Sequence, residues 1–148
     1  MFCIVVWGNA GITTLDRLII LQKRAIRLIT YSNFCAHTNP LFSKLNILKF
    51  TDLYILQILL FVNNCIYPPC SKHLCSFFYN FKYDFHNSIY PTRISHKTIK
   101  IPYFRTELRR NSTICMGAIL YNKYHFIMEA PSTLILKRQI KAYFANLY

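Results

Sequence analysis

Apolar side chains recur every three or four positions over residues 14–30, which is the spacing of one face of an α-helix. Basic side chains occupy the opposite face, so this segment is predicted to be an amphipathic helix. Thr13 and Asp16 fit a capping box, in which a hydroxyl and a carboxylate each accept a backbone N–H at the start of a helix. The apolar face consists of Leu15, Leu18, Ile19, Ala25, Ile26 and Ile29, and the basic face of Arg17, Lys23, Arg24 and Arg27.

Two further helices are predicted in the first half of the chain. Asn39 and Pro40 suit an N-cap and a first helical position, because proline lacks only a donor that the first turn leaves unpaired. Thr51 with Asp52 starts the next helix, which is apolar almost all the way round and is therefore expected to be central and buried. A pair of prolines beginning at Pro68 ends it. The two predicted helices span residues 40–46 and 52–66.

The second half of the sequence is irregular at first and helical towards its end. Ring-bearing residues crowd positions 77–90 without a lasting period of 2 or 3.6, so irregular structure with room for one hairpin is expected there. Ile94–Ile101 weakly favours a short strand. Helices are predicted over 115–124 and over 132–147, the latter capped by its first residue, a serine. Its apolar face carries Leu136, Ile140, Tyr143, Phe144 and Leu147, and its basic face carries Lys137, Arg138 and Lys141.

These patterns predict a mostly α fold: one small helical domain over residues 1–148, with an irregular, aromatic-rich middle segment. No internal repeat and no low-complexity tract suggests a division into two domains. At 53% hydrophobic residues, a chain of 148 residues can bury a substantial core.

The charge of the chain is strongly one-sided. There are 18 Lys+Arg against 5 Asp+Glu, giving a net charge of +13. Such a protein is expected to bind polyanions, either nucleic acid or an anionic membrane surface. The longest apolar stretch, Leu53–Val62, contains Gln57 and is far shorter than the ~20 residues of a membrane span, so no transmembrane segment is expected.

The six cysteines are interpreted as reduced thiols of an intracellular protein, nuclear or cytoplasmic. The apolar run Cys3–Gly8 has no basic segment before it and makes a poor signal peptide, so a secreted disulfide framework is disfavoured. Free cysteines commonly fill apolar positions, and the Asn111-Ser112-Thr113 sequon is then a chance match. The cysteines are Cys3, Cys35, Cys65, Cys70, Cys75 and Cys115.

The residue types needed for metal or nucleophilic chemistry are sparse. Two-metal catalysis requires convergent carboxylates, yet the acids Asp16, Asp52, Asp84, Glu107 and Glu129 are widely separated in sequence. The tightest ligand cluster is Cys65, Cys70, His73 and Cys75, whose spacing does not match a structural zinc site. No catalytic residue, metal site or cofactor is therefore predicted, and a small enzyme is the least favoured class.

Basic residues are the candidate binding residues. The guanidinium groups of arginine and the ammonium groups of lysine neutralise phosphates, and exposed aromatic rings stack on unpaired bases. For the set on the first helix, an ordinary solvated face and a nucleic-acid surface remain equally open. For the set near Tyr90, Tyr103 and Phe104, nucleic acid is favoured because balancing acids are missing. The first set is Lys23, Arg24 and Arg27, and the second is Arg93, Lys97, Lys100, Arg105, Arg109 and Arg110.

Several short strings of the sequence carry a resemblance to a known family. They are Trp7-Gly8-Asn9, Leu21-Gln22-Lys23-Arg24-Ala25-Ile26-Arg27 and Ala36-His37-Thr38-Asn39-Pro40-Leu41-Phe42, then Tyr90-x-Thr92-Arg93, Arg105-Thr106 and Gly117-x-x-Leu120-Tyr121-Asn122. In this order they resemble the region beyond the polymerase core of LINE-type, non-LTR retrotransposon reverse transcriptases of the jockey and chicken-repeat type. The resemblance runs from about Val6 to the end of the chain. One departure is Lys123-Tyr124-His125-Phe126, where the family continues with Ser-Leu-Pro.

The resemblance implies a non-catalytic C-terminal part of an RNA-directed DNA polymerase, which would bind RNA or DNA without strong sequence preference. The palm of the polymerase and its carboxylates would lie before Met1, and the missing polymerase core would be a partner. The alternative is a basic amphipathic module that binds a membrane surface or another protein.

Overall fold

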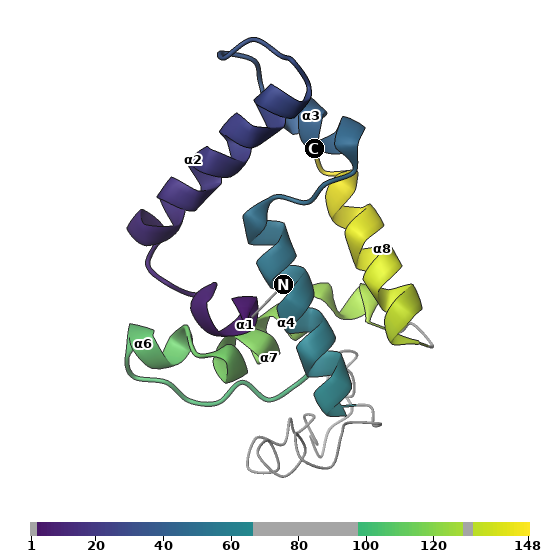
Figure 1. Cartoon of the computed structure of the whole chain (residues 1–148). Helices are drawn as coiled ribbons and strands as arrows, with labels where there is room; N and C mark the ends of the chain where they lie inside the picture. Colours follow the sequence, from purple (N-terminus) through teal and green to yellow (C-terminus); the bar gives the residue numbers. More distant parts are fainter. Residues whose placement is uncertain (1–2, 67–97, 129–131) are drawn as a thin grey trace.

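The computed structural model describes residues 3–66, 98–128 and 132–148, and within them the chain is mostly helical (Figure 1). The fold class predicted from the sequence is confirmed. The aromatic segment 77–90 and residues 94–97 of the predicted strand lie outside the described residues. Residues 98–101 form no strand, although Ile99 makes an isolated β-bridge. The described elements are α1 (Ile4–Trp7), α2 (Ile12–Ile29), α3 (Asn39–Leu45), α4 (Phe50–Ile66), α6 (Glu107–Arg110), α7 (Thr113–Tyr124), the 3-10 helix η1 (His125–Ile127) and α8 (Thr133–Ala145).

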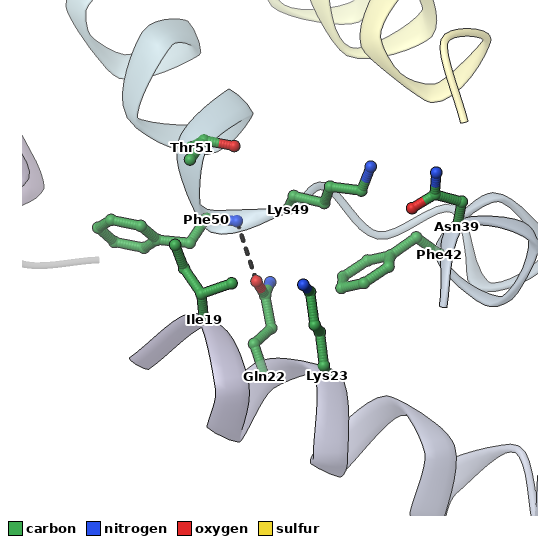
Figure 2. Close-up of a pocket in the computed structure, with 8 residues that line it drawn as sticks. All are labelled: Ile19, Gln22, Lys23, Asn39, Phe42, Lys49, Phe50 and Thr51. Atoms are coloured by element: carbon green, nitrogen blue, oxygen red, sulfur yellow. Dashed lines mark hydrogen bonds between the residues drawn. The ribbon is translucent and has the colours of Figure 1, made fainter. Parts of the chain in front are cut away.

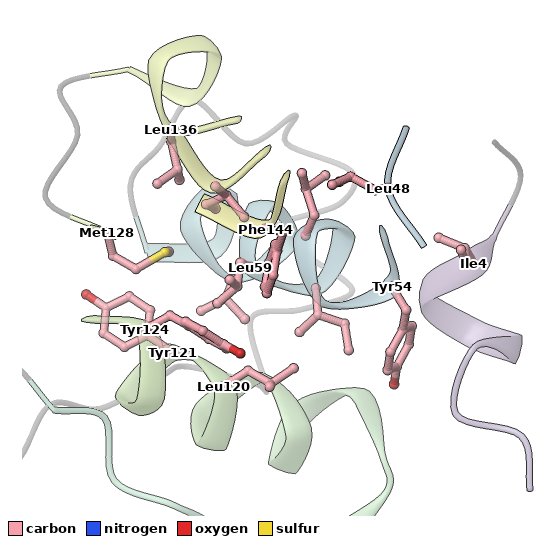
Figure 3. Packing of buried hydrophobic residues seen from close by; sticks show 14 of the residues in the cluster. Ile4, Leu48, Tyr54, Leu59, Leu120, Tyr121, Tyr124, Met128, Leu136 and Phe144 are labelled. Atoms are coloured by element: carbon pink, nitrogen blue, oxygen red, sulfur yellow. The ribbon is translucent and has the colours of Figure 1, made fainter. Parts of the chain in front are cut away.

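Helix α4 forms the centre of the fold, as its apolar sequence predicts. It packs against α7, α8 and α1 (Figure 1). Ile58, Leu59 and Val62 have no exposed surface. Figure 3 shows Leu59 between Phe144 of α8 and the side chains of α7. Burial of each such aliphatic side chain stabilises the fold by about 1.5–3 kcal/mol, so this cluster holds the three helices together.

The predicted starts of α2 and α3 are wrong in detail. Gly11 is the N-cap of α2, and no side chain caps the helix, so Thr13 and Asp16 lie inside the first turns and form no capping box. Helix α3 starts at Asn39 itself, with Thr38 at the N-cap position. Pro40 still lies within the first turn, where its missing N–H is harmless.

Helix α4 starts two residues earlier than predicted, at Phe50, because a distant side chain provides its cap. The backbone N–H of Phe50 donates to Oε1 of Gln22 on α2 at 3.0 Å. A local pattern cannot reveal such a cap. The predicted cap of α8 is confirmed, since Oγ of Ser132 accepts the N–H of Ile135 at 3.4 Å. Along α8, Leu136, Ile140 and Phe144 are buried as predicted, whereas Tyr143 is half-buried and Leu147 is exposed.

Only part of the predicted apolar face of α2 is buried. Ile26 is buried, and Leu15 and Ile19 are half-buried, because one edge of the helix faces α3 and the start of α4. The neighbouring edge is exposed, including Ala25 and part of the predicted face. We call this edge the α2 apolar stripe; its residues are Leu18, Leu21, Leu28 and Ile29, with exposed fractions of 37%, 62%, 76% and 60%.

The end of α1 and the turn after it contact the start of α4 and the end of α6. Trp7 stacks on Phe50, with ring centroids 5.4 Å apart. Gly8 lies against the ring of Tyr54, where a Cβ atom would come within 2.9 Å of Cε2 and closer still to Cδ2. The side chain of Asn9 donates to the carbonyl oxygen of Asn111 at 2.7 Å. Each residue of this short string therefore has a structural role.

Candidate nucleic-acid interface

A cavity of about 150 Å³ lies between α2, α3 and the start of α4. Ile19, Phe42 and Phe50 give it apolar walls, and Gln22 lines it beside them. Lys23, Asn39, Lys49 and Thr51 supply the remaining polar groups. In Figure 2 the side chain of Lys23 rises from α2, and that of Lys49 extends from the α3–α4 linker. We call this the lysine cavity.

Gln22 fixes the wall of the lysine cavity through both ends of its amide. Its Oε1 accepts the N–H of Phe50, and its Nε2 donates to the carbonyl oxygen of Leu48, both at 3.0 Å (Figure 2 shows the first bond). The amide therefore supplies the hydrogen-bond partner of each of these two backbone groups. It also sets the separation between α2 and the first turn of α4.

Tyr148 orders the other side of the cavity. Its hydroxyl accepts the backbone N–H of Lys49 at 2.9 Å and donates to the carboxylate of Asp52. The ammonium group of Lys49 lies 4.1 Å from the centre of the Tyr148 ring, a cation–π contact. Burial and, after it, the hydrogen bond to Asp52 raise the pKa of the Tyr148 hydroxyl, and the N–H of Lys49 acts in the opposite direction. This tyrosine therefore stays protonated and keeps Lys49 in place.

The predicted residues of α2 have three different environments. Lys23 lines the cavity and is exposed. Arg24 is exposed on the outer face. Arg27 is half-buried, its Nε donates to the carbonyl oxygen of Ala36 at 3.0 Å, and its guanidinium lies 5.9 Å from the centre of the Phe34 ring. Arg27 therefore holds the loop after α2 in addition to carrying a charge.

In the second predicted set, Arg93 and Lys97 lie outside the described residues. The other four, Lys100, Arg105, Arg109 and Arg110, are exposed. Arg110 pairs with Glu107 at 3.2 Å, but both side chains are largely exposed and such a pair adds little stability.

Helix α6, which carries two of these arginines, is fixed at both of its ends. Oγ1 of Thr106 accepts the N–H of Arg109 at 3.4 Å at its start. At its end, the bond from Asn9 to Asn111 ties the helix to the turn that precedes α2 (Figure 1). The structure thus joins the second basic set to the chain segment that leads into the first.

Lys49 and Asn39 are site residues that the sequence did not single out. Lys49 lies 26 positions from Lys23, and only the packing of α2 against the α3–α4 linker brings both to one cavity. A usable signal was present in the chain, since Lys49 directly precedes the first turn of α4, where unpaired N–H groups favour anions.

The described residues contain no group of three His, Cys, Asp or Glu side chains that could hold a metal ion. Three members of the Cys/His cluster, Cys70, His73 and Cys75, lie outside these residues. Cys115 is buried as expected of a thiol at an apolar position, whereas Cys3 and Cys35 are exposed, contrary to that expectation.

No single helix in the described part of the chain is long and apolar enough to cross a membrane. Helices α3 and α4 taken together pass this test by length and composition alone, as a pair bent by 52°.

Comparison with protein-family models, with curated proteins and with solved structures gave no match to this chain.

Proposed function

We propose that this chain binds single-stranded RNA or DNA with little sequence preference, as the non-catalytic C-terminal part of a LINE-type RNA-directed DNA polymerase. The observation that carries the binding proposal is unbalanced positive charge on a folded surface. Across residues 3–66, 98–128 and 132–148, the one ion pair between side chains joins Arg110 to Glu107. Exposed cations on α2 and around α6 are left to attract phosphate groups.

The strings that resemble the polymerase family support a structural rather than a catalytic role. Gln22 and Arg27 bond to backbone groups of the segment that follows α2. Asn122 bonds to both backbone groups of Ile99, at 2.8 and 2.9 Å. Side chains engaged in this way fix loops and are not available for chemistry.

The α2 apolar stripe supports the second half of the proposal, a protein surface that covers this chain in the parent enzyme. Aliphatic side chains exposed side by side on one helix are unusual for an isolated domain and mark a surface that meets a partner. In this proposal the polymerase core is that partner. Trp7 on α1 is also partly exposed, to 42%.

A second candidate function follows from the same helix. In α2 an apolar edge adjoins an edge bearing Arg17 and Arg24, which is the arrangement of helices that lie on anionic membranes. Salt weakens both kinds of binding, so salt dependence alone does not separate them.

Binding of the full chain to labelled single-stranded RNA and to anionic phospholipid vesicles, measured at the same ionic strength, separates the two functions. We expect RNA to bind more tightly. A triple substitution of Arg105, Arg109 and Arg110 to Gln should reduce the slope of log affinity against log salt by about 2, because each phosphate contact to a single strand contributes about 0.7. The control is the substitution of Lys137, Arg138 and Lys141 on α8 to Gln, which removes the same charge.

Tighter binding to the vesicles would replace the RNA proposal with the membrane one. Equal loss of RNA affinity in both triple variants would show that net charge alone, and not the surface around α6, determines binding.

A further inference from the structure

We propose that the lysine cavity binds the terminal phosphate of a nucleic-acid strand, that is, a phosphate monoester. This inference rests on the proposed nucleic-acid binding and names the group that one particular site recognises. Three properties of the cavity carry it: its charge, its donors and its size.

The charge of the cavity is positive. Lys23 and Lys49 line it from two different elements, and no carboxylate is among its lining residues. The nearest acid in sequence, Asp52, is held by the hydroxyl of Tyr148. The ammonium group of Lys49 lies over the Tyr148 ring at one side of the cavity, and that of Lys23 lies on the α2 side. A terminal phosphate carries a charge of about −1.5 to −2 at neutral pH, whereas a phosphodiester carries only one negative charge, so this positive surrounding favours the terminal group.

The donors around the cavity are of the kind that phosphate oxygens accept. The amide of Asn39 and the hydroxyl of Thr51 line it together with the lysines. The first turn of α4 leaves backbone N–H groups without partners inside the helix, and the positive end of the helix dipole adds to the field. Phe50 is the exception, since its N–H is already bonded to Gln22.

The shape of the cavity favours the end of a strand over its middle. A volume of about 150 Å³ equals roughly five water molecules, which is enough for one phosphate group. Phe42 and Phe50 are almost fully buried, so their rings form a wall and do not offer faces for stacking bases. A phosphodiester must leave such a site in two directions, while a terminal phosphate needs only one exit.

The test compares two short single-stranded RNAs of the same sequence, one with a 5′-phosphate and one with a 5′-hydroxyl, by fluorescence anisotropy with the full chain. We expect the phosphorylated RNA to bind about tenfold more tightly at low salt, which corresponds to one charge-assisted hydrogen bond. Lys23→Gln and Lys49→Gln should each reduce this ratio to within about twofold of one. Lys137→Gln and Lys141→Gln, on α8, should leave it unchanged.

Equal affinity of the wild-type chain for the two RNAs overturns this inference while leaving RNA binding itself intact. A ratio that survives Lys23→Gln also overturns it, and because Lys23 is exposed, this variant decides the question even if Lys49→Gln fails to fold. Tighter binding to vesicles containing phosphatidic acid than to the phosphorylated RNA would assign the cavity to a lipid phosphate instead. Absence of binding to either RNA would count against the proposed function as well.

Discussion

Replacement of Gln22 by Met removes both hydrogen bonds that join α2 to the start of α4 while keeping the length of the side chain. The two bonds, each 3.0 Å long and partly buried, link its amide to Leu48 and Phe50. At a net contribution of about 1 kcal/mol for each bond, the variant should lose about 2 kcal/mol of unfolding free energy. For a chain of this size that loss lowers the melting temperature by roughly 4–8 °C.

Thermal and urea unfolding, followed by circular dichroism, measure the global effect. Hydrogen exchange of the Phe50 amide measures the local one, because this N–H loses its acceptor directly. If α2 separates from the fold without global unfolding, exchange at Phe50 should rise by a factor of about thirty, the equivalent of 2 kcal/mol. The matched control is Gln139→Met, at an exposed position of α8.

A melting temperature of Gln22→Met within about 1 °C of the wild type, with unchanged exchange at Phe50, would refute this reasoning. The two bonds would then contribute no net stability. A similar loss in Gln139→Met would assign the effect to the Gln-to-Met change in general rather than to the contacts of Gln22.

Three further outcomes are expected. Gly8→Ala should lower the unfolding free energy, measured in urea, by about 1–3 kcal/mol, because the new Cβ overlaps the ring of Tyr54. Gly11→Ala, whose Cβ meets nothing within 4 Å, should change the unfolding free energy by less than about 1 kcal/mol. Equal losses in the two variants would contradict the close packing of Gly8 on Tyr54. The pKa of Tyr148 is raised above its usual 10.0 in the folded chain, so its contribution to stability is present below pH 10 and is lost as the pH rises further. Tyr148→Phe should therefore lose less unfolding free energy between pH 9 and 11 than the wild type. Parallel curves of unfolding free energy against pH for the two proteins would exclude a role of this hydroxyl in alkaline destabilisation. Leu136→Ala should cost about 2–5 kcal/mol and Leu134→Ala, at a position 60% exposed, much less; comparable melting temperatures would place Leu136 outside the core.

The sequence predicted the long helices well because their periodicity is a local property. All five predicted helices are present, with boundaries within about two residues. The two short helices α1 and α6 were not predicted, since each has only four residues and no periodicity to detect. The caps were harder, because Phe50 takes its partner from Gln22, 28 positions away.

The candidate site could be predicted only in part for the same reason. Lys23 was named from its basic helical face, but the face alone did not show that it borders a cavity. Lys49 belongs to the same cavity through packing of α2 against a linker, which no local pattern encodes. Burial of α2 was overestimated, since periodicity identifies an apolar face and not the amount of protein available to cover it, as Leu18 and Ile29 show.

The bonds that connect the first residues of the fold to the segment between α6 and α7 have a consequence for how the protein folds. Asn9 bonds to Asn111, and Thr113 donates to the carbonyl oxygen of Val5 at 3.2 Å, so residues more than a hundred positions apart must meet. The chain loses conformational entropy when such long loops close, before these contacts stabilise it. A helical chain of this kind therefore folds more slowly than its helix content suggests. Since α4 is buried mainly by α7 and α8, the segment ending at Ile66 has no complete core of its own, and it gains a stable fold only when the later helices join it.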